Sequence, residues 1–403
     1  MNMPWKMEKA KKMVEKQLTS NSWLAIFLFL ILGLVTALLA IYPAIVMTEA
    51  GQALNVPRDW VIGYYSFRWV YIVINLILLA SMWGINRRHQ FMSRILMMLA
   101  TIGVLLCIII ANFLLPWLFP TSQSTATYVS MKEADKFLKD QDVIYAVEIN
   151  GDVRGFPRKH LEIPHIAGDT IGGEEVAMTF CALSNLPVVV DQNSDDKKMN
   201  LAILIQVHNN MVMKDKNSGD LIQQITGTKE FSGDKLKVYP NDLMSWGNFK
   251  KRYPEAKIFE YQYNRPLDAV LLSLFEGPME RQFDPDHGPM FPTLDLKDNR
   301  LPQKETVWGV DLNGEQTAFS KEFIEDNPIY QFQLAGKPLV LVYDKDLDTV
   351  SLFDRELNGQ TARVEAIDID GNVAQGKLTK LPMHNGLFWM IWSHWYPESG
   401  LNG

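Results

Sequence analysis

The stretch that decides the fold runs from Val143 to Asp191 and reads VIYAVEINGDVRGFPRKHLEIPHIAGDTIGGEEVAMTFCALSNLPVVVD. Short runs of apolar and alternating residues are separated by Asn-Gly and Gly-Gly, which is typical of β-strands joined by tight turns. The stretch also holds Cys181, the only cysteine outside the apolar first third of the chain. We therefore expect a β-rich unit here and look for a functional site within it.

The same pattern recurs more weakly over residues 307–354. One constant shift without a gap aligns Val147–Gly151 with Val310–Gly314, and Asp191 with Asp354. Self-similarity at a fixed shift indicates a duplicated supersecondary unit, and this shift is too long for a solenoid. The sequence therefore predicts an internally duplicated domain.

The reactive residues of the first copy do not recur in the second. At the same shift, Cys181 aligns with Asp344 and His165 aligns with Pro328. We therefore predict an α+β outer domain in which only the first lobe carries a site. Its parts are a first lobe over 130–280, a connecting loop over 281–306 and a degenerate second lobe over 307–403.

Three apolar runs precede this domain. Trp23 to Met47 and Ile95 to Phe119 contain no charged residue, and the shorter run Trp69 to Ile85 lies between them. Roughly 20 apolar residues are enough to cross a bilayer as a helix. We predict a membrane domain over 23–119 with three transmembrane helices, followed by a short polar linker over 120–129. The first run is too long for a cleavable signal peptide.

The distribution of charge predicts the orientation. Residues 1–120 contain ten Lys or Arg against four Asp or Glu, and the rest of the chain contains 29 against 42. The basic residues gather in the N-terminal segment 1–22 and at Arg87, Arg88 and Arg94, which places both on the cytoplasmic side by the positive-inside rule. We therefore expect a multi-pass protein of the inner membrane with an extracytoplasmic C-terminal domain. Its acidic outer part lacks the basic footprint of a nucleic-acid-binding protein.

Helices are expected at three further places. Ser130 to Lys139 opens with Ser and has Glu three residues later, which is a capping-box signature. Asn241 to Arg252 begins with good cap residues. Trp389, Trp392 and Trp395 lie at helical spacing, which is more typical of a buried helix face than of a ligand platform.

Cys181 admits a structural and a functional interpretation. A lone cysteine at the end of an apolar run is usually a small core residue. As a nucleophile it would need a base such as His165 or His160 and a lowered pKa. As a metal ligand it would need partners from His160, His165, Asp169 and His208. The motifs of thioredoxins, zincins and serine hydrolases are absent from the sequence.

The wider pattern resembles a known family. The run IGGEEVAMTFCALSNLPVVVDQ, preceded by VEINGDVRGFP and PHIAGD, resembles the bacterial family carrying the domain of unknown function 3179, as do NNMVMKDKNSG and the closing LFWMIWSHWYP. The resemblance covers about residues 128–400. It implies the extent of the domain rather than a reaction, because the family has no settled activity. The matching positions are Arg154, Pro157, His165, Asp169, Gly172, Gly173, Cys181, Asn210 and Asp215.

The chain departs from the family pattern beside its candidate residues. Ser184 and Asn185 stand where many members have a second Cys or Thr followed by Gly, and Ile166 stands where the histidine is usually followed by Glu. These departures weaken the expectation of a paired-thiol or complete metal site.

Chain geometry predicts that Arg154, His165, Asp169 and Cys181 converge at one sheet end, because tight turns lay their strands side by side. In this hypothesis Cys181 and His165 are a catalytic pair or the ligands of a transition metal. Arg154, Asp169 and Asn210 would then bind an unidentified small molecule. The alternative is a non-catalytic binding or assembly module that associates with the lipid bilayer and a membrane protein partner. In that case Cys181 belongs to the core, and Arg154 and Asp169 form a simple ion pair.

Overall fold

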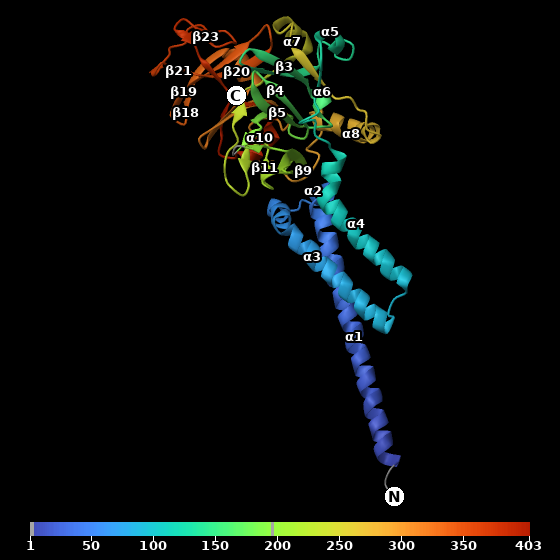
Figure 1. Ribbon diagram of the computed structural model, residues 1–403. Helices are drawn as coiled ribbons and strands as arrows, with labels where there is room; N and C mark the ends of the chain where they lie inside the picture. Colours follow the sequence, from blue (N-terminus) through green and yellow to red (C-terminus); the bar gives the residue numbers. More distant parts are fainter. Residues whose placement is uncertain (1–3, 195–196) are drawn as a thin grey trace. The chain divides into compact units, whose positions relative to one another are not determined.

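The computed structural model describes residues 4–194 and 197–403, and for 4–22, 194, 197 and 275–278 it describes the backbone alone (Figure 1). The side chains of the predicted basic segment 1–22 therefore lie outside the described part. The chain forms two compact units, Met1–Leu115 and Pro116–Gly403. Each is described by itself below.

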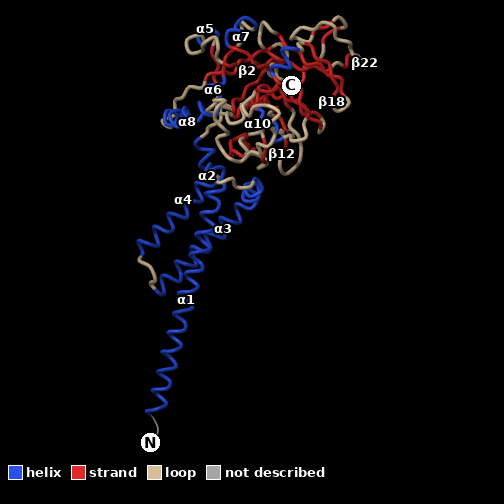
Figure 2. The backbone as a smooth tube through the Cα atoms, turned by 180° about the vertical axis from the view of Figure 1, so that it is seen from behind, coloured by secondary structure: helices blue, strands red, loops and turns tan. Residues whose placement is uncertain are grey.

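The first unit is helical (Figure 2). It contains α1 (Pro4–Val46), α2 (Glu49–Ala53), α3 (Arg58–His89) and most of α4 (Arg94–Leu118). Three segments are long and apolar enough to cross a membrane, namely Trp23–Val46, Arg58–His89 and Arg94–Leu118. Three candidate spans are thus present as predicted. The middle helix extends well beyond the apolar run 69–85, from Arg58 to a last turn that contains Arg87, Arg88 and His89.

Polar side chains inside these helices bond across helix interfaces. Asn112 Nδ2 on α4 donates to Tyr64 Oη on α3 at 2.9 Å, and Trp83 Nε1 donates to Thr101 Oγ1 at 3.0 Å. In a lipid environment such pairs satisfy groups that water cannot reach.

The second unit is β-rich, and five of its sheets have four or five strands in the described part of the chain, an arrangement like that of a five-bladed propeller. Its first part consists of β1 (Thr127–Val129), α5 (Met131–Ala134), β2 (Val143–Ile149), β3 (Asp152–Pro157), α6 (Arg158–Leu161), β4 (Ile166–Ile171), β5 (Glu174–Cys181), β6 (Leu186–Asp191), β7 (Asn193–Ser194), β8 (Lys197–Lys198), β9 (Leu201–Val207), β10 (Asn210–Asp215), β11 (Leu221–Gln223), β12 (Thr228–Lys229), β13 (Val238–Tyr239), β14 (Asp242–Ser245), α7 (Trp246–Arg252), β15 (Lys257–Glu260) and α8 (Asp268–Phe283). Its second part consists of β16 (Thr306–Leu312), β17 (Glu315–Ser320), α9 (Lys321–Asp326), β18 (Ile329–Leu334), β19 (Lys337–Asp344), β20 (Thr349–Asp354), β21 (Glu356–Leu357), β22 (Gln360–Thr361), β23 (Asn372–Val373), β24 (Gly376–Lys377), β25 (Thr379–Leu381), β26 (His384–Phe388), α10 (Trp389–Trp395) and β27 (Gly400–Asn402).

Local sequence explains the first hairpin. Asn150 and Gly151 both have positive φ, at 51° and 80°, as the tightest two-residue turns between β-strands require. β2 and β3 therefore pair antiparallel from Ile149 opposite Asp152 to Ile144 opposite Pro157.

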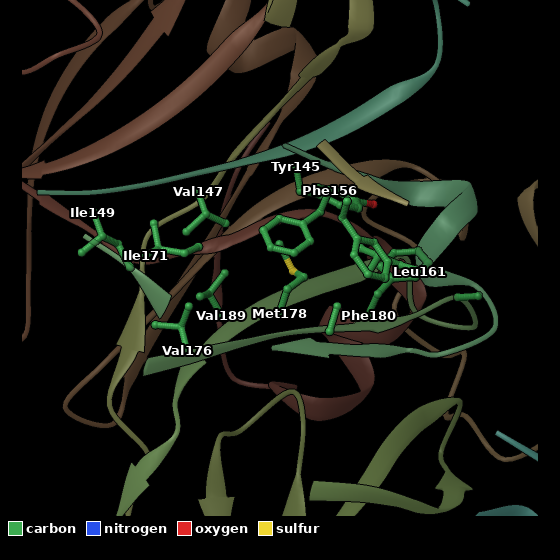
Figure 3. Close-up of a cluster of buried hydrophobic side chains, with 13 residues drawn as sticks. Tyr145, Val147, Ile149, Phe156, Leu161, Ile171, Val176, Met178, Phe180 and Val189 are labelled. Carbon is green, nitrogen blue, oxygen red and sulfur yellow. The ribbon is translucent and has the colours of Figure 1, made fainter. Parts of the chain in front are cut away.

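Two sheets enclose the core of the first lobe. Figure 3 shows Tyr145 and Val147 of β2 facing Met178 and Phe180 of β5. All four side chains are fully buried, and the side chain of Phe156 of β3 is 1% exposed. Each large apolar side chain buried in this way stabilises the fold by roughly 1.5–3 kcal/mol.

The second half of the unit has the same order of elements. β16 and β17 pair like β2 and β3, and β18, β19 and β20 pair like β4, β5 and β6. In the first half β14, α7 and β15 follow, and β15 pairs in parallel with β3 of the hairpin. In the second half β26, α10 and β27 follow, and β27 pairs in parallel with β17. A second buried cluster contains Trp308, Val310, Phe319 and Leu341, which stand at the constant shift from Tyr145, Val147, Phe156 and Met178.

Two local expectations need correction. The helix expected over Asn241–Arg252 begins only at Trp246, with Ser245 as its N-cap, because Asp242–Ser245 pairs with β2 as strand β14. The segment 120–129, expected as a linker, is built into the domain. Ser122 N donates to Ile166 O, and buried Gln123 accepts a bond from Leu201 N at 2.7 Å.

Candidate functional site

Arg154 and Asp169 form an ion pair between two sheets. Nε of Arg154 on β3 donates to Oδ2 of Asp169 on β4 at 2.6 Å, and Nη1 donates to Oδ1 of Asp152 at 2.5 Å. The Arg154 side chain is 9% exposed. Burial raises the pKa of Asp152, but hydrogen bonds from Arg154 and the Gly172 N–H outweigh it and hold this pKa below its usual value. The guanidinium therefore already faces two carboxylates, and their negative charges oppose the binding of an anionic ligand beside it.

His165 is a buried neutral imidazole at a bend in the chain. It has φ of 52°, its Nδ1 lies 3.1 Å from Leu161 O, and its ring stacks on Phe119 at 5.1 Å between centroids. Because a carbonyl oxygen can only accept, Nδ1 carries the proton. Burial lowers the pKa of His165 to about 4. These contacts fix the ring where the chain enters β4.

Cys181 faces away from the apolar core of the first lobe. Along β5, Phe180 belongs to that core, and successive side chains of a strand point to opposite faces. The fully buried sulfur lies 3.4 Å from Gln206 Oε1 and 3.9 Å from Asn209 O. Burial raises the pKa of the thiol. The protonated form, which donates to these amide oxygens, is therefore favoured.

Asn210 is fully engaged by its neighbours. Its Nδ2 donates to Ser184 Oγ and to Gln224 Oε1, each at 3.1 Å. Its Oδ1 accepts from Gln223 Nε2 at 2.8 Å and from Ile225 N at 3.1 Å. An amide has two donors and two acceptor lone pairs. Asn210 could therefore contact a ligand only if one of these bonds broke.

The sequence-predicted residues thus have different partners. Arg154 meets Asp169, whereas the hydrogen bonds of His165 and Cys181 go to other groups. Within residues 4–194 and 197–403, no group of three or more His, Cys, Asp and Glu side chains is arranged to hold a metal ion. The donor set that a transition metal requires is therefore missing around Cys181 in the described part.

A pocket of about 120 Å³ lies where three sheets meet, and no motif in the sequence points to it directly. Its lining comes from β6, from the turn after β11, from the approach to β13 and from β16 and β26; the residues are Pro187, Val188, Val189, Gln224, Ile225, Thr226, Gly227, Lys235, Leu236, Val238, Tyr239, Asn241, Asp311, Pro382, Met383 and His384. It combines an apolar wall with a few polar groups, which is the usual make-up of a small-molecule site.

Three charged or titratable side chains give this pocket its chemistry. Lys235 Nζ lies 2.9 Å from Asp311 Oδ2, with side chains 57% and 8% exposed. His384 Nε2 lies 2.7 Å from Ile225 O, and burial lowers the pKa of this imidazole. Within the described residues its Nδ1 has no hydrogen-bond partner. The only sequence signal was indirect, since His384 stands just before the aromatic stripe.

Comparison with known proteins places the domain in a family. The family described as "Protein of unknown function (DUF3179)" matches residues 119–399. No curated protein and no solved structure matches the chain. The match spans well over half of the sequence and nearly all of the β-rich unit, so the chain belongs to the DUF3179 family.

Proposed function

We propose that this protein is a membrane-anchored binding protein whose β-rich domain holds a small polar molecule in the pocket between three sheets. The observation that carries the proposal is that four segments far apart in the sequence line the same pocket. Segments around 187–189, 224–241, 311 and 382–384 contribute to one cavity. It pairs an apolar wall with a Lys–Asp ion pair and a neutral imidazole.

The pocket chemistry narrows the ligand class. The Lys235 ammonium has three N–H groups, and Asp311 occupies one of them. The Nε2 of His384 carries the proton donated to Ile225 O, so its Nδ1 is an acceptor. A volume of about 120 Å³ holds several water-sized groups. These features favour a small molecule with both donors and acceptors over an extended or purely anionic one.

A thermal-shift screen of the full-length protein in nanodiscs tests this function. A panel of small polar metabolites should contain a ligand that stabilises the protein, by about 2.7 kcal/mol at 100 times its Kd. Lys235→Gln and Asp311→Asn should abolish that shift. Lys297→Gln, at the exposed pair with Asp295, is the matched control and should keep it. A ligand that stabilises all variants equally, or a panel without any shift, would contradict the proposal.

A thiol site at Cys181 is a second candidate. The observation in its favour is that the sulfur lies 3.4 Å from Gln206 Oε1 and 3.9 Å from the carbonyl oxygen of Asn209, outside the apolar cluster that holds Phe180. Such a site would have to open before the thiol could ionise, because burial raises its pKa.

We also propose the predicted topology, with the N-terminus in the cytoplasm and the β-rich domain outside. Its support is the basic cluster of Arg87 and Arg88, at the end of the second candidate span, and Arg94, at the start of the third. A reporter that is active only outside the cytoplasm, fused after Gly403, should be active. Activity of a cytoplasmic reporter at that position would contradict the topology.

The domain is further proposed to be an internal duplication. Support comes from one pair of facing strand positions in each half, at which glycine and alanine are exchanged between the halves. In the first half Ala146 pairs with Gly155, and a Cβ at Gly155 would lie 2.8 Å from Phe249 of α7. In the second half, at the same shift, Gly309 pairs with Ala318, and a Cβ at Gly309 would lie 2.2 Å from Trp392 of α10. In each half, one strand glycine thus leaves room for an aromatic side chain of a helix, and we call this space the glycine gap.

A further inference from the structure

The helix α8 has one face packed on the β-rich domain and one exposed face with apolar side chains. On the packed face, Asp268 is 0%, Leu271 is 2% and Gln282 is 1% exposed. On the other face, Ala269, Val270, Ser273 and Leu274 follow one another at helical spacing and are all exposed. Both views show α8 projecting from the side of the sheets (Figures 1 and 2).

The exposed face is apolar rather than merely uncharged. Val270 is 50% and Leu274 is 61% exposed, and Leu272 beside them is 42% exposed. No charged residue occurs between Asp268 and Glu276. Single exposed apolar residues are common on soluble proteins, but a contiguous group marks an interaction surface.

The start of α8 is fixed to the end of a candidate membrane span. Arg265 Nη2 donates to the carbonyl of Leu118 at 3.1 Å, and Leu118 is the last residue of the span Arg94–Leu118. Arg265 also faces the buried carboxylate of Asp268, at 3.5 Å from Nε to Oδ1. Leu118 and α8 belong to the same compact unit. The start of α8 therefore lies beside the C-terminal end of this candidate span.

We propose that α8 is an interfacial helix, whose face Ala269–Val270–Ser273–Leu274 inserts into the headgroup–acyl boundary of the bilayer that the spans cross. Continuity with the span identifies lipid as the occupant, since the hydrogen bond to Leu118 holds the apolar face at the level where the chain enters water. Amphipathic helices bind membranes in this way, with one face at the boundary and the other on protein or solvent. Arg265 precedes the helix and exposed Arg281 lies in its last turn, at positions where cations meet lipid phosphates.

Spin labels on the full-length protein in nanodiscs test this inference. The parent is Cys107→Ala, because Cys181 is 0% exposed and does not label in the folded state. Val270→Cys and Leu274→Cys carry the label, and Leu296→Cys, 38% exposed in the loop after α8, is the matched control. The ratio of oxygen to nickel-chelate collision rates should be several-fold higher at 270 and 274 than at 296.

Two outcomes would overturn the proposal. Equal ratios at the three positions would mean that the α8 face lies in water. Dipolar broadening between labels at 274 would mean that a second copy of the chain covers it instead. A double variant, Val270→Glu with Leu274→Glu, gives an independent readout: trypsin should cleave after Arg281 several-fold faster than in the parent when both are in nanodiscs, and at equal rates in detergent. Equal rates in nanodiscs would also contradict membrane contact.

Discussion

Arg154 Nε lies 2.6 Å from Asp169 Oδ2 and thereby links β3 of one sheet to β4 of the next. The pair lies 15 residues apart in the chain, on either side of the bend at His165. Two sheets that share an apolar core thus also share a charge contact, between the central strand β3 of one sheet and the edge strand β4 of the other.

Removal of this contact should destabilise the domain. Arg154→Met leaves Asp169 and Asp152 facing each other, with side chains 21% and 42% exposed. We expect a loss of about 1–3 kcal/mol in the free energy of unfolding, less than for a fully buried pair because water screens both carboxylates. Urea unfolding followed by tryptophan fluorescence measures it. Arg363→Met, at the exposed pair with Glu365, should change stability by less than about 0.5 kcal/mol.

The thiol of Cys181 should be unreactive in the folded protein. In a Cys107→Ala background, the rate of alkylation by N-ethylmaleimide should follow the rate of unfolding, because the sulfur is fully buried and burial raises its pKa. Mass spectrometry along a urea series measures the modification. Rapid labelling without urea would instead favour the thiol-site candidate.

His165 should make stability fall between pH 6.5 and pH 4, whereas Glu162, whose pKa burial raises to about 7, should act in the opposite direction between pH 7 and pH 4.5. Burial lowers its folded-state pKa to about 4, from an unfolded value near 6.5. At His165 the unfolded chain therefore binds a proton in this window that the folded chain does not, so the contribution of His165 to stability rises with pH from 4 to 6.5 and is level above. His165→Asn, which tolerates the positive φ, should reduce the change by at most about 3 kcal/mol.

The control for this experiment comes from the other buried histidines. Burial also lowers the pKa of His160 and His394 to about 4, so part of the pH dependence should persist in His165→Asn. Chemical unfolding at half-unit intervals of pH measures the slope. An unchanged slope in the variant would show that His165 is not neutral in the folded protein.

The glycine gap under α10 should be sensitive to a single methyl group. Gly309→Ala places a Cβ 2.2 Å from Cζ3 of fully buried Trp392, and overpacking of this kind costs about 1–3 kcal/mol. Trp392→Phe introduces the ring that the first half has in Phe249. The double variant should be more stable than the sum of the single losses predicts, and strict additivity would show that the two positions do not touch.

Local patterns predicted the first lobe well because its turns have strong chemistry. The β-rich stretch predicted from Val143 onward begins with β2 (Val143–Ile149), and the capping box of Ser130 and Glu133 is confirmed. The aromatic stripe is also buried as expected, with Trp389 and Trp392 at 0% exposure. Each of these features depends on residues within a few positions of one another, which a single sequence contains in full.

Prediction failed where distant segments decide the outcome. Asn241 and Asp242 have the signature of a helix cap, but pairing of Asp242–Ser245 with β2 makes this segment a strand. The pocket could not be derived for the same reason, because its lining unites four stretches that only the tertiary fold brings together. Proximity of Arg154 and Asp169 was predictable from two tight turns, whereas the direction in which His165 and Cys181 point was not.

The segment that leaves the last candidate span has a mechanical consequence. Ser122 is bonded to Ile166 and Gly168, and β1 then joins the edge of a sheet by pairing with β15. A pull from the bilayer would first meet the contacts of Leu118 with Arg265 and of Phe119 with His165, then the Ser122 bonds to β4, and only then the β1 ladder. The anchor is thus coupled to the fold, and tension on the membrane side would reach β4, which holds Asp169, before it reached the sheet that holds Arg154.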